Sequence, residues 1–220
     1  RIGQELPLGV TVQGAVCVLH TGPTDVVWLD KLKSRLVSRG AKVAFVNVET
    51  LQTFTLDSKL PYSIVVNRLS DALPPPLARF AVSFMTYAAA QGLPVINGAA
   101  AYATATSKIS QHALFHASQL ATPQTFLVRN SMDAELAMPA FRGEKVLFKP
   151  NAGSFGKGIR EFSDLDSLRE HSQRPAAFGN DGVALLQKYH NVESVHRVFV
   201  LEQKVQCGVS VAIERKSAFT

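Results

Sequence analysis

The stretch that decides the fold is Val146-Leu147-Phe148-Lys149-Pro150-Asn151-Ala152-Gly153-Ser154-Phe155-Gly156-Lys157-Gly158-Ile159. It predicts an apolar strand ending in a lysine, a loop with three glycines in six residues, and a second strand from Ile159. Glycines let backbone N–H groups turn toward a ligand. Successive inward N–H groups bind an anion, and the adjacent lysine adds a positive charge. The stretch therefore predicts a nucleoside triphosphate site; the alternative is a glycine-rich hairpin turn without a ligand.

Two better-known phosphate loops are excluded by the order of residues. A Walker A loop needs Gly-Lys followed by Ser or Thr, whereas Gly156-Lys157 is followed by Gly158. A dinucleotide fingerprint needs G-x-G-x-x-G at the start of a helix. Here the glycines lie at positions 153, 156 and 158, and residues 159–162 are typical of a strand.

Composition indicates a globular protein with a substantial core, because 46% of the 220 residues are hydrophobic and 18% are charged. The net charge of +6 comes from scattered rather than clustered Lys and Arg, which suits a nucleotide-binding enzyme better than a nucleic-acid binder. No signal peptide or membrane span is recognisable. Cys17 and Cys207 lack metal-ligand spacing, so we expect a reducing, cytoplasmic location and an inert, buried Cys17. Because the chain runs from Arg1 to Thr220, we expect a piece of a longer protein.

The first half of the sequence has the rhythm of an open α/β sheet. Apolar runs predict strands over residues 14–20, 41–48, 63–66 and 93–97. One helix follows the cap Thr24, with an apolar stripe of Leu29, Leu32 and Leu36, and ends at Gly40. A second helix follows the prolines at 74–76, and its expected inner face consists of Leu77, Phe80, Phe84 and Tyr87, before Gly92 ends it.

The second half predicts an α+β arrangement of antiparallel strands with helices on one side. Ser107 can cap a helix with Ile109, Ala113, Ala117 and Leu120 on one face. Strands are predicted over 124–128, 145–149, 183–189, 197–201 and 204–214, and a helix over 164–171. The small residues at 98–106 are the expected domain boundary, which gives domains 1–98 and 99–220.

The order of these pieces resembles the ATP-grasp superfamily, and most of all its RimK-type carboxylate–amine ligases. The resemblance extends over about residues 60–216 and rests on Gly92-Leu93-Pro94-Val95-Ile96-Asn97, Lys108, the 148–158 segment, Leu185-Leu186-Gln187-Lys188-Tyr189, and His196-Arg197-Val198-Phe199-Val200. It implies an α/β plus α+β fold: an N-terminal open α/β (pre-ATP-grasp) domain and a partial ATP-grasp domain. The first ATP-grasp subdomain would cover 99–189 and the second would begin at 190.

The resemblance also implies a site for ATP and Mg²⁺ between two subdomains. Lys108 and Lys149 would contact phosphates, or in the case of Lys149 the adenine edge. A mobile lid would consist of Gly153, Ser154, Phe155, Gly156, Lys157 and Gly158, and a hinge of Gln187, Lys188 and Tyr189 would pair with adenine through its backbone. Arg197 and Arg215 would face the reacting centre, and Arg68 would bind the carboxylate or the acceptor substrate.

Three departures from the family pattern bear on activity. Lys188 stands where the hinge of the family usually carries Glu. Val195 stands where the family carries an acid that contacts the ribose, and Glu193 is the candidate to take the place of that acid. The family's magnesium ligands would lie beyond residue 220, so no residue here is assigned to the metal.

The function expected is an ATP-dependent carboxylate–amine ligase that forms an amide through an acyl phosphate, with amino acids or peptides as substrates and the homo-oligomeric state common in the family. The alternative is a catalytically silent nucleotide-binding module with a regulatory or scaffold role.

Overall fold

The computed structural model describes residues 14–22, 26–51, 55–71, 73–153, 156–174, 176–201 and 203–212. The chain divides into two compact units, residues 1–114 and 115–220, and each unit is described by itself. The division expected near residue 98 stays a prediction about domain organisation.

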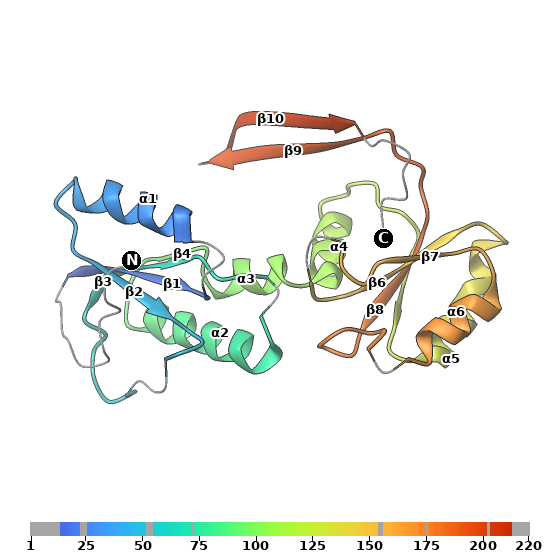
Figure 1. Cartoon of the computed structure of the whole chain (residues 1–220), viewed down its shortest axis with the longest axis horizontal. Coiled ribbons are helices and arrows are strands. Elements are labelled where there is room, and N and C mark those ends of the chain that lie inside the picture. Colours follow the sequence, from blue (N-terminus) through green and yellow to red (C-terminus); the bar gives the residue numbers. More distant parts are fainter. Residues whose placement is uncertain are drawn as a thin grey trace. The chain divides into compact units, whose positions relative to one another are not determined.

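The first unit is built on a parallel sheet of four strands, shown at the blue and cyan end of Figure 1. The strands are β1 (Ala15–His20), β2 (Val43–Asn47), β3 (Tyr62–Asn67) and β4 (Val95–Ile96), in the order β2-β1-β3-β4. Val18 of β1 lies opposite Phe45 on one side and Val66 on the other. The continuous apolar run of β1 is explained by this central position, because a strand covered on both faces must be apolar throughout.

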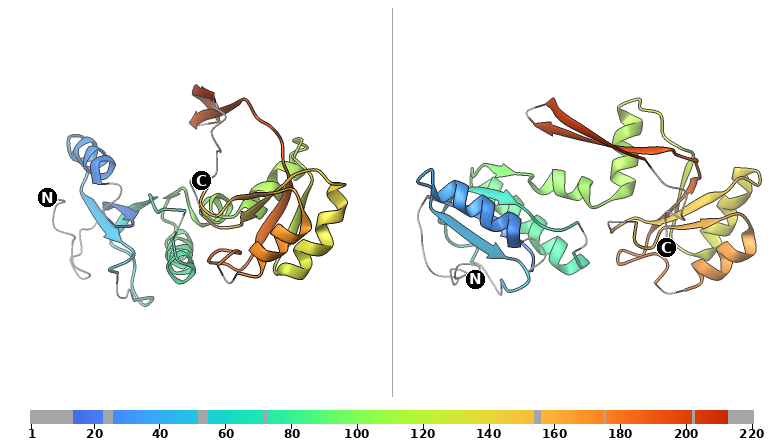
Figure 2. Two further views of the ribbon diagram at one scale, coloured as in Figure 1. Left: turned by 45° about the vertical axis from the view of Figure 1, so that its right-hand side comes forward. Right: turned by 45° about the horizontal axis from the view of Figure 1, so that its top comes forward.

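Two helices cover opposite faces of this sheet (Figures 1 and 2). Helix α1 (Val26–Val37) packs Leu29 against Val18 and Phe45. Helix α2 (Pro75–Ala90) packs on the face that carries Cys17, Leu19 and Val65. The predicted helix ends are confirmed: Gly40 and Gly92 both have φ of +80° and follow α1 and α2. The expected cap Thr24 lies outside the described residues.

The inner face of α2 differs from the one expected. Its buried residues are Ala81, Phe84, Met85 and Ala88, so only Phe84 of the four expected side chains is buried. Leu77, Phe80 and Tyr87 are half-buried instead. The small residues of the segment 98–106 form a further helix, α3 (Ala99–Ala105), whose Tyr102 is buried in the same core.

Helix α4 (Lys108–Ala117) begins where the sequence predicts it. The Ser107 hydroxyl oxygen accepts a hydrogen bond from the N–H of Ser110 at 3.2 Å, which confirms the predicted cap. None of the residues of α4 is buried. The division between the two units falls within this helix, after Leu114.

The second unit is built on an antiparallel sheet with helices on one face. Its strands are β5 (Thr125–Val128), β6 (Val146–Pro150), β7 (Arg160–Phe162) and β8 (Ala184–Lys188), in the order β5-β8-β6-β7. One face packs against α5 (Ser131–Ala137), the 3₁₀ helix η2 (Met138–Phe141) and α6 (Leu165–Ser172). The core there includes Phe148, Phe141 and Leu168.

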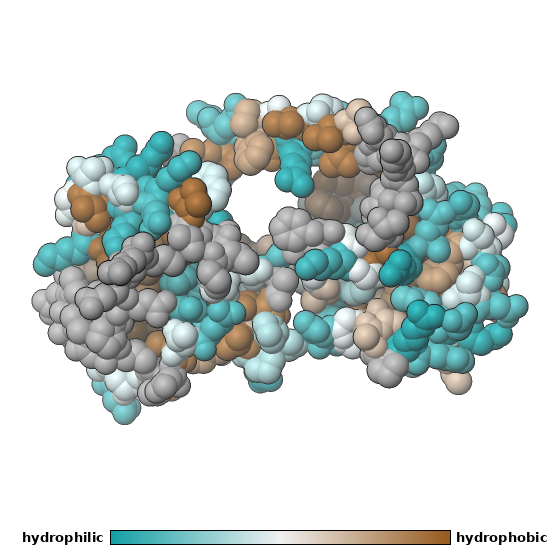
Figure 3. Space-filling model, viewed as in Figure 1, coloured by the Kyte–Doolittle hydropathy of each residue, from teal (hydrophilic) through white to brown (hydrophobic). Residues whose placement is uncertain are grey.

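Strands β9 (Ser194–Leu201) and β10 (Lys204–Ala212) form a separate antiparallel ribbon, drawn in red in Figure 1. Apart from the half-buried Ser194, every described residue of both strands is exposed. Several are large and apolar, and Figure 3 shows this band as brown atoms along the ribbon. Across the described ranges of the chain, no helix is long and apolar enough to cross a membrane.

Candidate nucleotide and substrate sites

Strand alternation on β6 decides where Lys149 lies. Val146, Phe148 and Pro150 are buried, and the first two belong to the core beneath α5 and α6. Successive side chains on a strand point to opposite faces. Leu147 and the half-buried Lys149 therefore lie on the face of the sheet opposite these helices. The sequence places a cation at the end of a strand whose other side is anchored in the core.

A chain of hydrogen bonds fixes the ammonium of Lys149. Its Nζ donates to Oε1 of Gln187 on the neighbouring strand β8. The amide Nε2 of Gln187 donates to the Thr125 hydroxyl at 2.9 Å, and that hydroxyl donates to the carbonyl of Pro123 at 2.8 Å. Each donor and acceptor in this chain has a defined role, so the lysine is held in one direction. The sequence alone assigned Gln187 to the hinge and gave no sign of this positioning role.

Hydrogen bonds fix both ends of the glycine loop: the first end is bonded to the segment that leads into β8, and the second end closes on itself as a turn. The N–H of Asn151 donates to the Val183 carbonyl at 2.9 Å, and its side-chain amide donates to Asp181 at 2.6 Å. At the far end, the N–H of Ile159 donates to the Gly156 carbonyl at 3.1 Å and closes a turn.

Backbone dihedrals explain the glycines of this loop. The φ angles of Gly153, Gly156 and Gly158 are +115°, +70° and +78°, a region that side-chain-bearing residues rarely adopt. Lys157 is exposed in the turn. Ser154 and Phe155 lie outside the described residues.

The hinge residues lie where β8 ends. The Lys188 ammonium forms an ion pair with Glu144, and the Lys188 N–H donates to the Gln124 carbonyl at 2.9 Å. The N–H of Tyr189 donates to the Lys145 carbonyl, also at 2.9 Å. These two backbone donors are therefore engaged within the second unit.

The other expected nucleotide contacts lie on separate elements. Lys108 is the first residue of α4 and is half-buried in the first unit. Glu193 is exposed just before β9, and Arg197 lies on β9 opposite Val209, in a different sheet from Lys149. Arg215 lies outside the described residues. The structure thus brings Lys149 and Gln187 together beside the two ends of the glycine loop.

Arg68 lies at the carboxyl edge of the first sheet. Its N–H donates to the Leu19 carbonyl of β1 at 2.9 Å, directly after β3 ends at Asn67. The buried Asn67 amide donates to the Asn97 carbonyl at 2.8 Å and accepts from the Leu69 N–H at 2.9 Å. This network fixes the backbone on both sides of Arg68.

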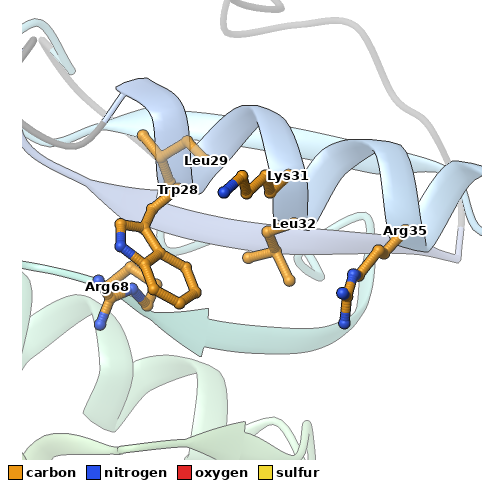
Figure 4. A pocket seen from close by; sticks show the side chains of 6 residues that line it. All are labelled: Trp28, Leu29, Lys31, Leu32, Arg35 and Arg68. Carbon is orange, nitrogen blue, oxygen red and sulfur yellow. The ribbon is translucent and has the colours of Figure 1, made fainter.

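A pocket that the sequence did not reveal adjoins Arg68. It has a volume of about 590 Å³ and is shown in Figure 4. Its described lining consists of Trp28, Leu29, Lys31, Leu32, Arg35 and Arg68. The available signal was the spacing of residues 28, 31, 32 and 35, which recur at the interval that places side chains on one face of a helix.

The described residues offer limited chemistry for covalent catalysis or metal binding. Burial raises the pKa of the Cys17 thiol to about 12, so this cysteine is an inert core residue, as expected. Among the described ranges, no group of three or more His, Cys, Asp or Glu side chains could hold a metal ion. The described parts of the two sites thus consist of cations, amides and backbone groups, which bind and orient anions.

Comparison with known proteins identifies the fold through structure alone. No protein-family model matches the sequence, and no curated protein matches it. A RimK-domain ATP-grasp protein from Sphaerobacter thermophilus is 18% identical, with a TM-score of 0.65 over 84% of this chain and 68% of that chain. D-alanyl-alanine synthetase A from Vibrio cholerae is 13% identical, with a TM-score of 0.69 over 94% of this chain and 71% of the other.

A third solved structure, D-alanine–D-alanine ligase from Bacillus anthracis complexed with ATP, is 13% identical, with a TM-score of 0.68 over 93% of this chain and 68% of that one. Each of these three matches extends over most of this chain. This chain therefore has the ATP-grasp fold.

Proposed function

We propose that this protein is an ATP-dependent carboxylate–amine ligase that forms an amide or peptide bond. The observation that carries the proposal is the fixed ammonium of Lys149, held by Gln187 beside a glycine loop. The likeness to solved ligases, one of them complexed with ATP, supports the same function. A positioned cation and a side-chain-free loop are what a triphosphate needs from a protein.

The residues present fit ATP. In this proposal Lys149 and Lys108 neutralise phosphate oxygens, and the loop containing Gly153, Gly156 and Gly158 closes over them. Space is open beside Gly153, because an added Cβ there would meet no atom within 4 Å. The hinge would accept from the adenine amino group through its carbonyl oxygens, since the N–H groups of Lys188 and Tyr189 are already engaged.

The proposed chemistry proceeds in two steps without a covalent enzyme intermediate. A substrate carboxylate attacks the γ-phosphate and ADP leaves; an amine then attacks the acyl phosphate, loses a proton and displaces phosphate. The protein contributes positioning and charge neutralisation. In this scheme Arg68 holds the carboxylate, for which a guanidinium is suited by its two parallel N–H donors, and Arg197 and Arg215 face the transferring group.

Mg²⁺ would assist phosphoryl transfer, but the described residues include no cluster of ligands that fits it. We therefore derive no step through the metal. The substrates proposed are a carboxylate and an amine of the amino acid or peptide class. A cytoplasmic location is part of the proposal, which the free thiols of Cys17 and Cys207 support.

Nucleotide binding can be tested by calorimetric titration with ADP. We expect Lys149→Ala to weaken ADP binding at least about tenfold, because it removes a charge-assisted contact. Gln187→Leu should weaken binding less, since the ammonium stays but loses its orientation. Arg174→Ala is the control: this cation pairs with Glu170 of α6 at an exposed position, away from the hinge and the glycine loop, and its loss should leave ADP affinity unchanged. Equal affinity of Lys149→Ala and the parent protein would remove the nucleotide site from the proposal.

A second candidate function is a nucleotide-binding module without catalysis. It is favoured by the Lys188–Glu144 ion pair, because Lys188 stands where the ligases of this type usually carry a hinge acid. The two functions separate in an assay of ADP release over a panel of amino acids and peptides. Release that depends on both a carboxylate and an amine supports the ligase, and nucleotide binding without release supports the module.

A further inference from the structure

Thr125 lies at the start of β5, beside the strand that carries Gln187. The register sets Thr125 opposite Gln187 on one side of β8, and Leu147 opposite Gln187 on the other side. Residues that lie opposite one another share a face of a sheet, as do residues two apart on one strand. Thr125, Gln187 and Lys149 therefore lie on one face of the sheet, the face opposite α5 and α6.

The hydroxyl of Thr125 decides which way the Gln187 amide points. It carries a single proton, which it donates to the carbonyl of Pro123 at 2.8 Å. Toward Gln187 the hydroxyl oxygen can then only accept, and it accepts from Nε2 at 2.9 Å. The amide oxygen Oε1 is left on the other side of the group, where it accepts from the Lys149 ammonium.

A reversed Gln187 amide would lose the hydrogen bonds on both of its sides. Nε2 would face the Lys149 ammonium, although both groups are donors, and Oε1 would face a Thr125 oxygen whose proton is already donated. All three side chains are half-buried, so water compensates only in part for a lost partner. The Thr125 hydroxyl thus excludes the second orientation of the amide and gives Lys149 an acceptor in a fixed direction.

We propose that Thr125 is a positioning residue of the nucleotide site: through Gln187 it directs the Lys149 ammonium toward the bound nucleotide. Thr125 itself touches no nucleotide in this proposal. The role rests on the proposed function, because it requires that Lys149 contacts ATP. The competing explanation is that Thr125 only supports the pairing of β5 with β8.

Two substitutions at position 125 separate positioning from structural support. Thr125→Ser keeps the hydroxyl and loses a methyl group, whereas Thr125→Val keeps the shape and loses the hydroxyl. Strand propensity favours Val over Ser, so a purely structural role predicts that Thr125→Val is the better tolerated of the two. Positioning predicts the opposite order for ADP affinity.

ADP affinity is measured by calorimetric titration of the whole chain. We expect Thr125→Val to weaken ADP binding about fivefold, because the ammonium stays but loses its orientation, and Thr125→Ser to remain within about twofold of the parent protein. Thr86→Val is the matched control: this exposed hydroxyl on α2 donates to the Val82 carbonyl at 2.8 Å, and its loss should leave ADP affinity unchanged. Thr125→Val binding ADP as tightly as Thr125→Ser, or an equal loss in Thr86→Val, would overturn the positioning role.

A double-mutant cycle tests whether Thr125 acts through Gln187. In a Gln187→Leu background the hydroxyl has no amide to orient, so adding Thr125→Val should weaken ADP binding no further. A second loss of about fivefold in this background would mean that Thr125 acts by another route, and it would contradict the proposed role.

The orientation of the amide can also be followed without nucleotide. The Nε2 protons of Gln187 give side-chain signals in the NMR spectrum of isotope-labelled protein, and Gln187→Leu identifies these signals by their loss. Donation to Thr125 should slow the exchange of these protons with water, so we expect faster exchange in Thr125→Val and parent-like exchange in Thr125→Ser. Equal exchange rates in all three proteins would overturn the role of Thr125. Failure of the parent protein to bind ADP would instead count against the proposed function, and the exchange rates would still decide whether Thr125 orients Gln187.

Discussion

Replacing Gly158 by alanine tests how the glycine loop is joined to strand β6. Gly158 has a φ of +78°, and a Cβ added there would lie 2.9 Å from Cγ of Pro150. On a second loop, a Cβ on Gly179 would lie 3.1 Å from Cβ of the same proline. The buried ring of Pro150 is therefore packed between two glycines. A methyl group at 158 must displace this ring or the loop.

The expected loss of unfolding free energy is the sum of two costs and one gain. The left-handed backbone costs a non-glycine residue about 1–2 kcal/mol, and forcing an extra carbon into a packed site costs about 1–3 kcal/mol. Reduced freedom of the unfolded chain returns about 0.4–1 kcal/mol. The central values of these terms add up to a destabilisation of about 3 kcal/mol for Gly158→Ala. Gly182→Ala is the matched control, because its φ is +71° and no atom lies within 4 Å of the added Cβ, so it should lose only about 1 kcal/mol.

Urea denaturation followed by far-UV circular dichroism measures both losses. Tryptophan fluorescence is unsuitable, because Trp28 lies in the first unit and does not report on the second. In the double variant Pro150→Ala/Gly158→Ala the obstructing Cγ is gone. The double variant should therefore lose less unfolding free energy than the sum of the losses in the single variants Pro150→Ala and Gly158→Ala. Equal losses for Gly158→Ala and Gly182→Ala, with additive behaviour of the double variant, would refute the packing argument.

Three further predictions concern a cap, a histidine and the cysteines. The Asn130 side chain accepts from the Asp133 N–H at 2.8 Å and caps α5, so Asn130→Ala should lower the unfolding free energy by about 1 kcal/mol in urea titration, whereas Asn130→Ser should retain most of it. Burial lowers the pKa of His171, so the unfolded chain takes up its proton first; stability should be full above about pH 6.5 and fall below it, and this fall should be smaller in His171→Leu when melting is followed across pH. In the folded protein a thiol reagent should modify one cysteine rapidly, the exposed Cys207, and the buried Cys17 only on unfolding; rapid modification of both would contradict the burial of β1.

The strands and their boundaries were predictable where a periodic pattern and a breaker residue coincide. The apolar run of β1 and the prolines at the start of α2 each carry a signal that acts within a few residues. The same holds for the glycine at the end of each of the first two helices, because a positive φ is a local requirement.

The inner face of α2 shows where such reasoning fails. Large aromatic residues predicted the buried side, but Ala81 and Ala88 occupy it, and Phe80 and Tyr87 remain half-buried. Tyr87 keeps its hydroxyl near the surface, where it donates to the Leu56 carbonyl at 2.7 Å. Which side of a helix is buried depends on the elements that it packs against. Where a helix lies close to a sheet, small residues fit between them, and the hydrophobicity of the side chains alone does not predict these positions.

The sequence pattern did not predict helix α5 or the 3₁₀ turn after it, although the residue that caps the helix could be recognised. Asn130 followed by Asp133 is a capping pattern, and Ala134 and Ala137 are the residues it buries. The segment is short, and Met132 and Leu136 lie on its exposed side. Apolar residues therefore occur on both sides of the helix, and no single apolar face can be recognised from the sequence.

The candidate sites were predictable in part. The glycine loop and Lys149 stand together in the sequence, so their proximity is local. The link from Lys149 to Gln187 spans 38 residues and depends on the register that sets Leu147 opposite Gln187. The pocket beside Trp28 likewise joins α1 to Arg68 across a crossover connection, which no local pattern encodes.

The exposed ribbon of β9 and β10 has a practical consequence for every measurement above. Each of its strands has one partner in the described sheets, so both outer edges offer unsatisfied peptide groups, and Phe199, Val205 and Val209 add apolar side chains. Such edges recruit further strands from other molecules. Self-association should therefore grow with protein concentration. Light scattering at each working concentration distinguishes ligand binding from association of protein molecules through this ribbon.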